Sequence, residues 1–267
     1  MRIPRAALVS AMVAATLGLA ACSANAVPAS APAAKASALS GTLVVDAAAS
    51  LTGTFQKLGA EFHAEHPGVT VTFNFGGSSA LAAQIVSGAP ADVFASASPA
   101  TMKSVTDAGA AATAPVVFVR NRLEIAVPAS NPGHVTGLKD LADPAKKIAL
   151  CAPEVPCGAA AVTVFTKAGL TPAPDTLEPD VKAALTKVQL NEVDAALVYR
   201  TDVQAAGDGI SGISFPEADS AINDYLIAPL KASTHRKLAA AFVAFILGDH
   251  GKTVLGAAGF DLPKSQQ

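Results

Sequence analysis

The chain has 267 residues, of which 51% are hydrophobic and only 15% are charged, and its formal net charge is −2. This length suits one large or two modest domains, and the apolar fraction is ample for a hydrophobic core. The slightly negative charge argues against a nucleic-acid-binding surface, which requires a clustered basic face.

The N-terminus has the pattern of a bacterial export signal. Arg2 and Arg5 form a short positive region, and residues 6–20 form an apolar run that is too short for a comfortable membrane span. The following motif LAAC resembles a lipobox, so we expect acylation of Cys22. An ordinary secretory signal, in which this cysteine has no role, is the alternative.

On this interpretation residues 1–21 are a lipoprotein signal peptide. Residues 22–40, rich in Ala, Pro and Ser, would form a disordered tether between the lipid and the folded domain. The protein would then be exported and lipid-anchored to the outer face of the cell membrane.

From Gly41 onward, short β-like runs alternate with helical patterns. This β-α-β-α order predicts parallel sheets covered by helices on both faces. The expected strands lie at 41–50, 69–75, 91–96, 120–130, 146–153 and 194–199, and the expected helices lie at 51–66, 79–88, 99–109, 136–142, 157–170, 180–190 and 235–260.

The order of elements predicts two α/β lobes, because a second run begins near residue 120 and a helical pair closes the chain. We expect lobe I to contain 41–119 plus 225–267 and lobe II to contain 120–224, with a ligand cleft between them. Closure would be hinge-like, around the two crossings near Val119 and 214–225.

Open α/β sheets bind ligands beyond the carboxyl ends of their strands, where helix N-termini offer free amides and a partial positive charge. Each serine at such a junction is, by itself, more typical of a helix N-cap than of a ligand site. Five junctions nevertheless share suitable chemistry, and they are centred on Ser50, Ser78, Cys157, Val181 and Tyr199.

Signatures of enzymes and metal sites are weak. The chain contains no G-x-S-x-G, S-x-x-K or H-E-x-x-H motif, and GGSSA at 76–80 lacks the spacing and lysine of a P-loop. The histidines of HAEH, His63 and His66, are more typical of a solvated helix end than of a metal site. We therefore expect no catalytic residues, no direct metal ligands and no cofactor.

Besides Cys22, the chain contains two cysteines, Cys151 and Cys157. Export permits disulfides, and the spacing fits a small looped disulfide, although free thiols are the alternative. A redox-active pair is disfavoured because the C-x-x-C spacing is missing.

Several stretches together resemble the periplasmic molybdate-binding proteins of ABC importers. They are VVDAAASLTGTFQKL, HPGVTVTFNFGGSSALAAQIVSGAPADVFASAS, RNRLEIAVP, LCAPEVPCG, DAALVYRTD and the closing AAAFVAFILGDHGKTVLGAAGF. The resemblance extends from about Gly41 to Phe260. It implies a two-lobed, type II periplasmic-binding-protein fold, in which each lobe is a mainly parallel sheet flanked by helices and a tetrahedral dianion binds in the cleft.

The resemblance also implies a ligand set made of neutral groups. Ser50 and Ser78 would contribute hydroxyls, Cys157 and Val181 main-chain amides, and Tyr199 its phenol. The chain departs from the family pattern in three ways: it has one residue fewer between Glu154 and Pro156 than many relatives, Cys157 stands where relatives usually have Ala, and Arg200 stands where they often have a small residue.

The sequence thus predicts a monomeric solute-binding lipoprotein that captures molybdate, and also tungstate, through the oxygens of the anion. It would deliver the anion to an ABC permease and its ATPase. The same fold binding sulfate or a small organic anion is the nearest alternative. A lipid-anchored hydrolase and a structural or adhesive lipoprotein are more distant ones.

Overall fold

A computed structural model describes residues 39–263 of the chain. The predicted signal peptide, the acylated Cys22 and nearly all of the predicted tether lie outside these residues. Leu39 and Ser40, the last two residues assigned to the tether, are described. Leu39 packs against the main hydrophobic core, and its carbonyl lies close to Gly68.

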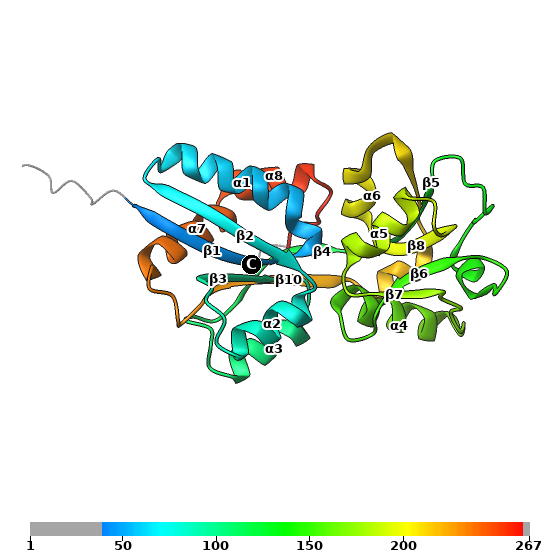
Figure 1. Cartoon of the computed structure of the whole chain (residues 1–267), viewed down its shortest axis with the longest axis horizontal. Helices are drawn as coiled ribbons and strands as arrows, with labels where there is room; N and C mark the ends of the chain where they lie inside the picture. The colour runs from blue at the N-terminus through cyan, green and yellow to red at the C-terminus, as the bar shows by residue number, and fades with distance from the viewer. Residues whose placement is uncertain (1–38, 264–267) are drawn as a thin grey trace, which may run out of the picture. The chain divides into compact units, whose positions relative to one another are not determined.

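Ten strands form two five-stranded sheets in the described part of the chain (Figure 1). Sheet I has the order β2-β1-β3-β10-β4, and sheet II has the order β7-β6-β8-β5-β9. The strands are β1 (Gly41–Ala48), β2 (Val69–Gly76), β3 (Val93–Ser96), β4 (Val116–Asn121), β5 (Leu123–Pro128), β6 (Ile148–Cys151), β7 (Thr176–Glu178), β8 (Ala195–Tyr199), β9 (Ile210–Ile213) and β10 (Asn223–Pro229).

Each sheet is mainly parallel with one reversed strand, so the predicted α/β fold of two lobes is confirmed. In sheet I, β10 runs antiparallel to both β3 and β4, while β1 pairs in parallel with β2 and β3. In sheet II, β5 runs antiparallel to both β8 and β9, while β6 pairs in parallel with β7 and β8.

Helices cover the sheets as expected for parallel strands joined by crossover connections. Figure 1 shows α1, α7 and α8 on one side of sheet I and α2 and α3 on the other. The helices are α1 (Thr52–Glu65), α2 (Ser78–Val86), α3 (Pro99–Asp107), α4 (Pro156–Ala168), α5 (Val181–Gln189), α6 (Arg200–Ala206), α7 (Arg236–Leu247) and α8 (Asp249–Ala257), with 3₁₀ turns η1 (Ala49–Leu51), η2 (Leu138–Ala142), η3 (Gly207–Gly209) and η4 (Pro216–Ser220).

The chain crosses between the sheets twice. It passes from β4 to β5 at Arg122, and it returns between β9 and β10 through η4. The predicted lobe boundaries, after residue 119 and before residue 225, both fall inside strands of sheet I. They do so because β4 and β10 keep pairing as far as Asn121 and Asn223.

The described residues lie in one compact unit, and the largest hydrophobic core extends through both sheets. A smaller core fills the space between sheet I and the helices α2 and α3, around Phe94, Met102 and Leu81. Among residues 39–263, no single helix is long and apolar enough to cross a membrane. In this part of the chain, the helices α7 and α8 taken together, bent by 57° at their junction, reach that length and composition.

Candidate anion-binding site

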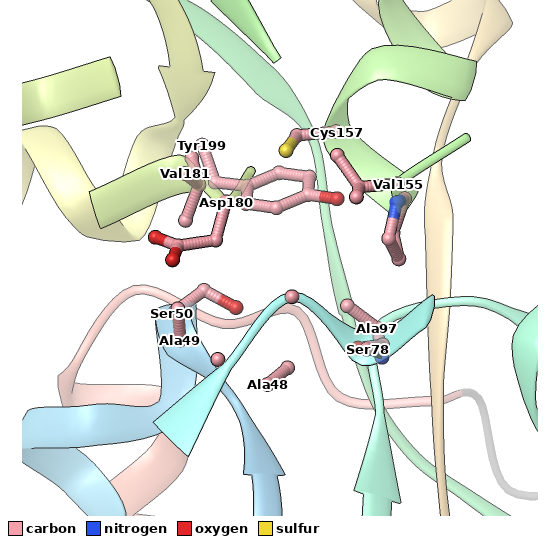
Figure 2. Close-up of a pocket in the computed structure, with 13 residues that line it drawn as sticks. Ala48, Ala49, Ser50, Ser78, Ala97, Val155, Cys157, Asp180, Val181 and Tyr199 are labelled. Carbon is pink, nitrogen blue, oxygen red and sulfur yellow. Dashed lines mark hydrogen bonds between the residues drawn. The ribbon is translucent and has the colours of Figure 1, made fainter. Parts of the chain in front are cut away.

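A small pocket lies where strand ends of both sheets meet the starts of helices (Figure 2). Its volume, including the open mouth, is about 220 Å³. It is lined by Ala48, Ala49, Ser50, Gly76, Gly77, Ser78, Ala97, Val155, Pro156, Cys157, Asp180, Val181 and Tyr199.

The lining divides into two walls, which face each other in Figure 2. Wall I follows strands of sheet I and consists of the residues from Ala48 to Ala97 in this set. Wall II follows strands of sheet II and consists of the residues from Val155 to Tyr199. All five residues predicted from the sequence line the pocket: Ser50 and Ser78 on wall I, and Cys157, Val181 and Tyr199 on wall II.

The helices α2, α4 and α5 begin at the pocket. Neither α2 nor α4 has a side-chain cap: their N-cap residues are Gly77 and Val155, and Pro156 occupies the first turn of α4. The first-turn amides of a helix have no partner within the helix. The starts of α2 and α4 therefore present main-chain donors of the kind that bind anions.

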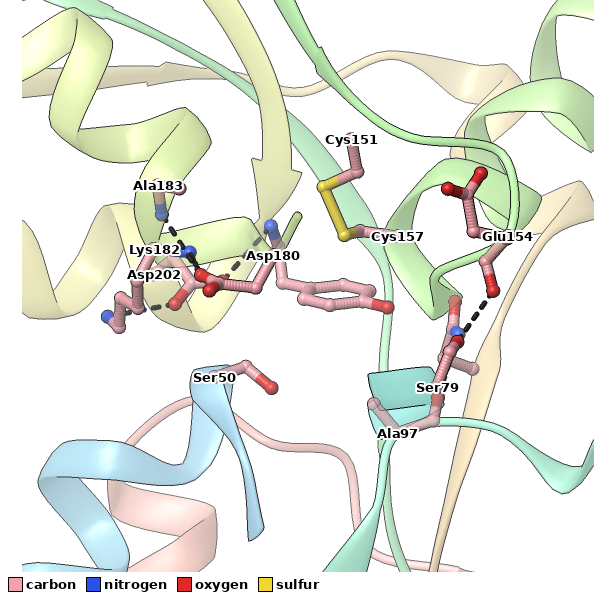
Figure 3. The surroundings of a disulfide bond; sticks show 12 residues. Ser50, Ser79, Ala97, Cys151, Glu154, Cys157, Asp180, Lys182, Ala183 and Asp202 are labelled. Carbon is pink, nitrogen blue, oxygen red and sulfur yellow. Dashed lines mark hydrogen bonds and ion pairs between the residues drawn. A yellow bond between two sulfur atoms is a disulfide. The ribbon is translucent and has the colours of Figure 1, made fainter. Parts of the chain in front are cut away.

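The start of α5 is arranged differently. The carboxylate of Asp180 accepts hydrogen bonds from the amides of Lys182, at 2.8 Å, and Ala183, at 3.0 Å (Figure 3). The amide of Ala184 donates to the carbonyl of Asp180. The Val181 amide is therefore the one first-turn amide of α5 that does not bond to Asp180.

The two serines of wall I are held in place by hydrogen bonds within the protein. The Ser50 hydroxyl lies 2.8 Å from the Tyr225 hydroxyl, and the Ser78 hydroxyl accepts a bond of 3.0 Å from the Ala97 amide. Both serines are buried. Because Ser78 uses its oxygen as an acceptor, its own hydrogen stays available for a ligand.

Tyr199 supplies a buried phenol at the end of β8. The residue is 1% exposed, and its hydroxyl has no hydrogen-bond partner among the described residues. Burial holds the pKa of Tyr199 well above its ordinary value, so the phenol keeps its proton. A buried donor without a partner is uncommon in folded proteins, and it marks a position where a ligand would complete the bonding.

The pocket has no cationic lining. Among its lining residues, all of them described, there is no lysine or arginine, and the carboxylate of Asp180 is used in capping α5. Arg200, next to Tyr199, is not part of the lining. It pairs instead with Asp261, at 3.0 Å, and with the carbonyl of Gly259.

An ion pair lies behind wall II. The Lys182 ammonium is 2.9 Å from a carboxylate oxygen of Asp202, which is fully buried. The other oxygen of Asp202 accepts a bond of 3.3 Å from the Tyr199 amide, and Figure 3 shows the pair beside α5. Burial raises the pKa of Asp202, against the opposing effect of Lys182.

Cys151 and Cys157 form a disulfide, with their Cα atoms 5.8 Å apart (Figure 3). The bond ties the end of β6 to the first turn of α4, so the side chain of Cys157 is used in the bond while its amide remains at the pocket. Gly158 packs so closely that a Cβ there would overlap the carbonyl of Ala152. The turn between β6 and α4 is therefore tightly constrained.

Sequence reasoning missed the residues that support the site. Asp180 could have been found as an Asp directly before a helical pattern, which is typical of an N-cap. Tyr225 and Asp202 gave no local signal, because their partners come from distant segments or depend on the fold of the turn. The candidate metal site at His63 is a separate matter. Within residues 39–263 no group of three or more potential metal ligands occurs, and Nδ1 of His63 lies 2.6 Å from the Val69 carbonyl oxygen.

Two mainly parallel α/β lobes with a pocket of helix N-termini between them define a solute-binding protein of the type II periplasmic-binding fold. A family model described as "Bacterial extracellular solute-binding protein" matches residues 43–261. The chain is 41% identical to the molybdate-binding protein ModA of Mycobacterium tuberculosis over 256 residues, which cover 96% of this chain and 97% of that protein. It is 32% identical to ModA of Escherichia coli over 241 residues, covering 83% and 90% of the two chains.

The structure also resembles the periplasmic molybdate-binding protein of Azotobacter vinelandii. The TM-score is 0.73 at 24% identity, with 83% of this chain and all of that chain covered. The chain belongs to the bacterial extracellular solute-binding proteins. It is also 32% identical over 230 residues to YvgL of Bacillus subtilis, which is named a putative ABC transporter substrate-binding lipoprotein, with 82% of this chain and 86% of that protein covered. This membership confirms the expectation of an extracytoplasmic binding protein that is not an enzyme.

Proposed function

We propose that this protein captures molybdate, and also tungstate, outside the cytoplasm and delivers it to an ABC permease and its ATPase. The observation that carries the proposal is the small pocket lined by neutral donors, in a chain 41% identical to a molybdate-binding protein over 96% of its length. The ligands are the hydroxyls of Ser50 and Ser78, the amides of Cys157 and Val181, and the phenol of Tyr199.

Physical chemistry supports neutral donors for a dianion. A buried dianion is costly unless its oxygens are hydrogen-bonded. Hydrogen bonds to charged groups contribute about 1.5–3 kcal/mol each. Several such bonds from two walls account for micromolar or tighter binding, which corresponds to about −8 kcal/mol or below.

The donor set also explains selectivity. A fully deprotonated tetrahedral anion offers only acceptors, which matches hydroxyl and amide donors on both walls. A protonated phosphate brings a hydrogen that needs an acceptor, which a main-chain amide does not offer. Binding should therefore favour tetrahedral anions that are fully deprotonated at neutral pH.

In this proposal the two sheets belong to two lobes that close on the anion, with hinges at the crossings near Arg122 and η4. Cys22 carries the lipid that anchors a monomer to the outer face of the membrane. Replacing Cys22 with Ala should release the protein from the membrane fraction of expressing cells. Retention of the variant in that fraction would contradict the anchor without affecting the ligand assignment.

Titration calorimetry with molybdate, tungstate and sulfate tests the ligand. We expect binding of molybdate and tungstate, and the double variant Ser78→Ala/Tyr199→Phe should lose most of that affinity. Ser104→Ala, which removes a serine bonded only within α3, is the matched control. Binding of sulfate without heat from molybdate would reject the proposal, and turnover of an ester or phosphate substrate would favour a hydrolase.

A further inference from the structure

Gly77 occupies a position at which its own backbone does not require glycine. It is the N-cap of α2, with φ −61° and ψ 125°, an extended conformation that any residue adopts. A Cβ built on Gly77 would nevertheless overlap the carbonyl oxygen of Pro179, and it would lie 3.5 Å from the side chain of Val155. Both of these neighbours belong to the opposite side of the pocket. The need for glycine therefore comes from across the pocket.

A second direct link joins the same two sides. The Ser79 hydroxyl, in the first turn of α2, donates a hydrogen bond of 2.6 Å to the carbonyl of Glu154 (Figure 3). Glu154 lies in the turn between β6 and α4, which the disulfide of Cys151 and Cys157 closes. The start of α2 thus makes two contacts across the pocket. Ser79 contacts Glu154 in the turn before α4, and Gly77 contacts Pro179, the residue before the N-cap of α5.

We infer that Gly77 and Ser79 fix the distance between the two walls and so determine which size of oxyanion the pocket accepts. This inference rests on the proposed function of the pocket. Gly77 permits the approach because it has no side chain, and Ser79 holds the approach with its hydrogen bond. Neither role requires a hydrogen bond from the Ser79 side chain or from Gly77 to the anion.

The geometry of hydrogen bonds explains why this distance controls specificity. Donor–acceptor distances for N–H and O–H donors fall within about 2.5–3.2 Å, so a shift of part of an ångström weakens a bond substantially. An anion that must reach donors on both walls is sensitive to their separation. A wider gap removes more bonds from a small anion such as sulfate than from the larger molybdate.

The test uses Gly77→Ala and Ser79→Ala with two matched controls. Gly256→Ala places a methyl group on α8 where, among the described residues and apart from its chain neighbours and the backbone of its own helix, no atom lies within 4 Å. Ser104→Ala removes a hydroxyl that bonds within α3. Calorimetry with molybdate and sulfate, stopped-flow dissociation rates, thermal unfolding and small-angle X-ray scattering are measured for each variant.

For Gly77→Ala we expect molybdate affinity to fall by at least about tenfold. The ratio of sulfate to molybdate affinity should fall as well. The ligand-free melting temperature should match that of the wild type, because alanine fits the extended backbone once the walls separate. For Ser79→Ala we expect faster molybdate dissociation with little change in association. Scattering should show a more open average structure for both variants and no change for the controls.

The role of Gly77 is rejected if Gly77→Ala keeps the molybdate affinity, the ratio of sulfate to molybdate affinity and the scattering profile of the wild type. An unchanged dissociation rate in Ser79→Ala would overturn the role of the serine. These results differ from failure of the proposed function, in which the wild type itself binds no oxyanion. In that case the scattering comparison still decides whether the two residues hold the walls together.

Discussion

The two walls of the pocket present different donors, mainly hydroxyls on wall I and main-chain amides on wall II, and they are supported by different means. On wall I, the hydroxyls of Ser50 and Ser78 are oriented by single hydrogen bonds, to Tyr225 and to the Ala97 amide. On wall II, the supports are a disulfide, the Asp180 cap and the ion pair of Lys182 with the buried Asp202. Wall I is thus positioned by side-chain contacts, and wall II is positioned through its backbone.

The difference follows from the donors that each wall supplies. A hydroxyl rotates, so it needs a fixed partner to direct its hydrogen, and a neighbouring phenol or amide is sufficient. A main-chain amide points where its helix points, so its direction depends on the turn before the helix. Substitutions on wall II should therefore affect folding stability most, and substitutions on wall I should affect mainly binding.

The largest effect is expected from Lys182→Met. The variant leaves the carboxylate of Asp202 buried without its cation, and removal of one partner of a buried ion pair typically costs about 3–5 kcal/mol. Because the Lys182 side chain is 34% exposed, we expect a loss near the lower end, about 3 kcal/mol, at pH 7. Denaturant unfolding measures it, and Lys57→Met, on the exposed face of α1, is the control.

The pH dependence of this loss has a definite sign. Burial raises the folded-state pKa of Asp202 above its unfolded value, so the folded state binds a proton more readily. The cost of the unpaired carboxylate is present at neutral pH and disappears as the pH falls through the folded-state pKa. The stabilities of Lys182→Met and wild type should therefore converge in acid. A constant difference across that range would show that the ion pair does not support wall II.

Removing the disulfide tests the covalent support of wall II. The bond closes a loop with a sequence separation of 6, for which chain entropy predicts about 2–3 kcal/mol of stabilisation. We expect Cys151→Ala/Cys157→Ala to lose this amount in thermal or denaturant unfolding, and reduction of the wild type with dithiothreitol to give a similar loss. Weaker molybdate binding should accompany it, because the Cys157 amide is less well positioned. If reduction left the stability unchanged, the disulfide would not be a support of wall II.

Tyr199→Phe separates binding from stability within wall II. The phenol hydroxyl is buried without a partner, so its removal should leave the stability of the ligand-free protein unchanged or slightly higher. Loss of a hydrogen bond to a charged ligand of about 1.5–3 kcal/mol should lower molybdate affinity by about 10- to 150-fold. Calorimetry and thermal unfolding measure the two quantities. If the ligand-free protein became less stable while the molybdate affinity stayed unchanged, the Tyr199 hydroxyl would stabilise the fold and would not bind the anion.

Much of the fold and of the pocket lining was predictable from the sequence because the signals are local. Alternating and helical patterns place strand ends next to helix starts, and the five predicted residues lie at such junctions. The supports were not predictable in this way. Ser50 meets Tyr225 across 175 residues of sequence, and Arg200 meets Asp261 across 61. Such pairings depend on strand order, including the reversed β10, which periodicity alone does not give.

The lobe boundaries illustrate the same limit. A change from one α/β run to the next marks a crossing only approximately, because a strand continues as long as it has a partner. Arg120 and Asn121 follow the predicted boundary, yet they pair with Asp224 and Asn223 in sheet I. Arg120 also forms an ion pair with Asp224, at 2.6 Å. This pairing was hidden in the sequence because the partner strand comes about a hundred residues later.

The smallest effects are expected on wall I, from Ser50→Ala and Tyr225→Phe. Both variants remove the hydrogen bond of 2.8 Å between Ser50 and Tyr225, but Ser50→Ala also removes a hydroxyl that binds the anion. We expect Ser50→Ala to lower molybdate affinity by about tenfold, the lower end for a bond to a charged ligand, and Tyr225→Phe to lower it by less. The double variant should bind no more weakly than the weaker of the two single variants, because Tyr225 acts by directing the Ser50 hydroxyl. Titration calorimetry on the four proteins of this double-mutant cycle measures the coupling. Additive losses would mean that Tyr225 acts by another route, and the Tyr199 ring, with its centroid 6.0 Å away, is the contact that offers one. In that case Tyr225 would support both walls. Separate supports for the two walls would then apply to Ser78 but not to Ser50.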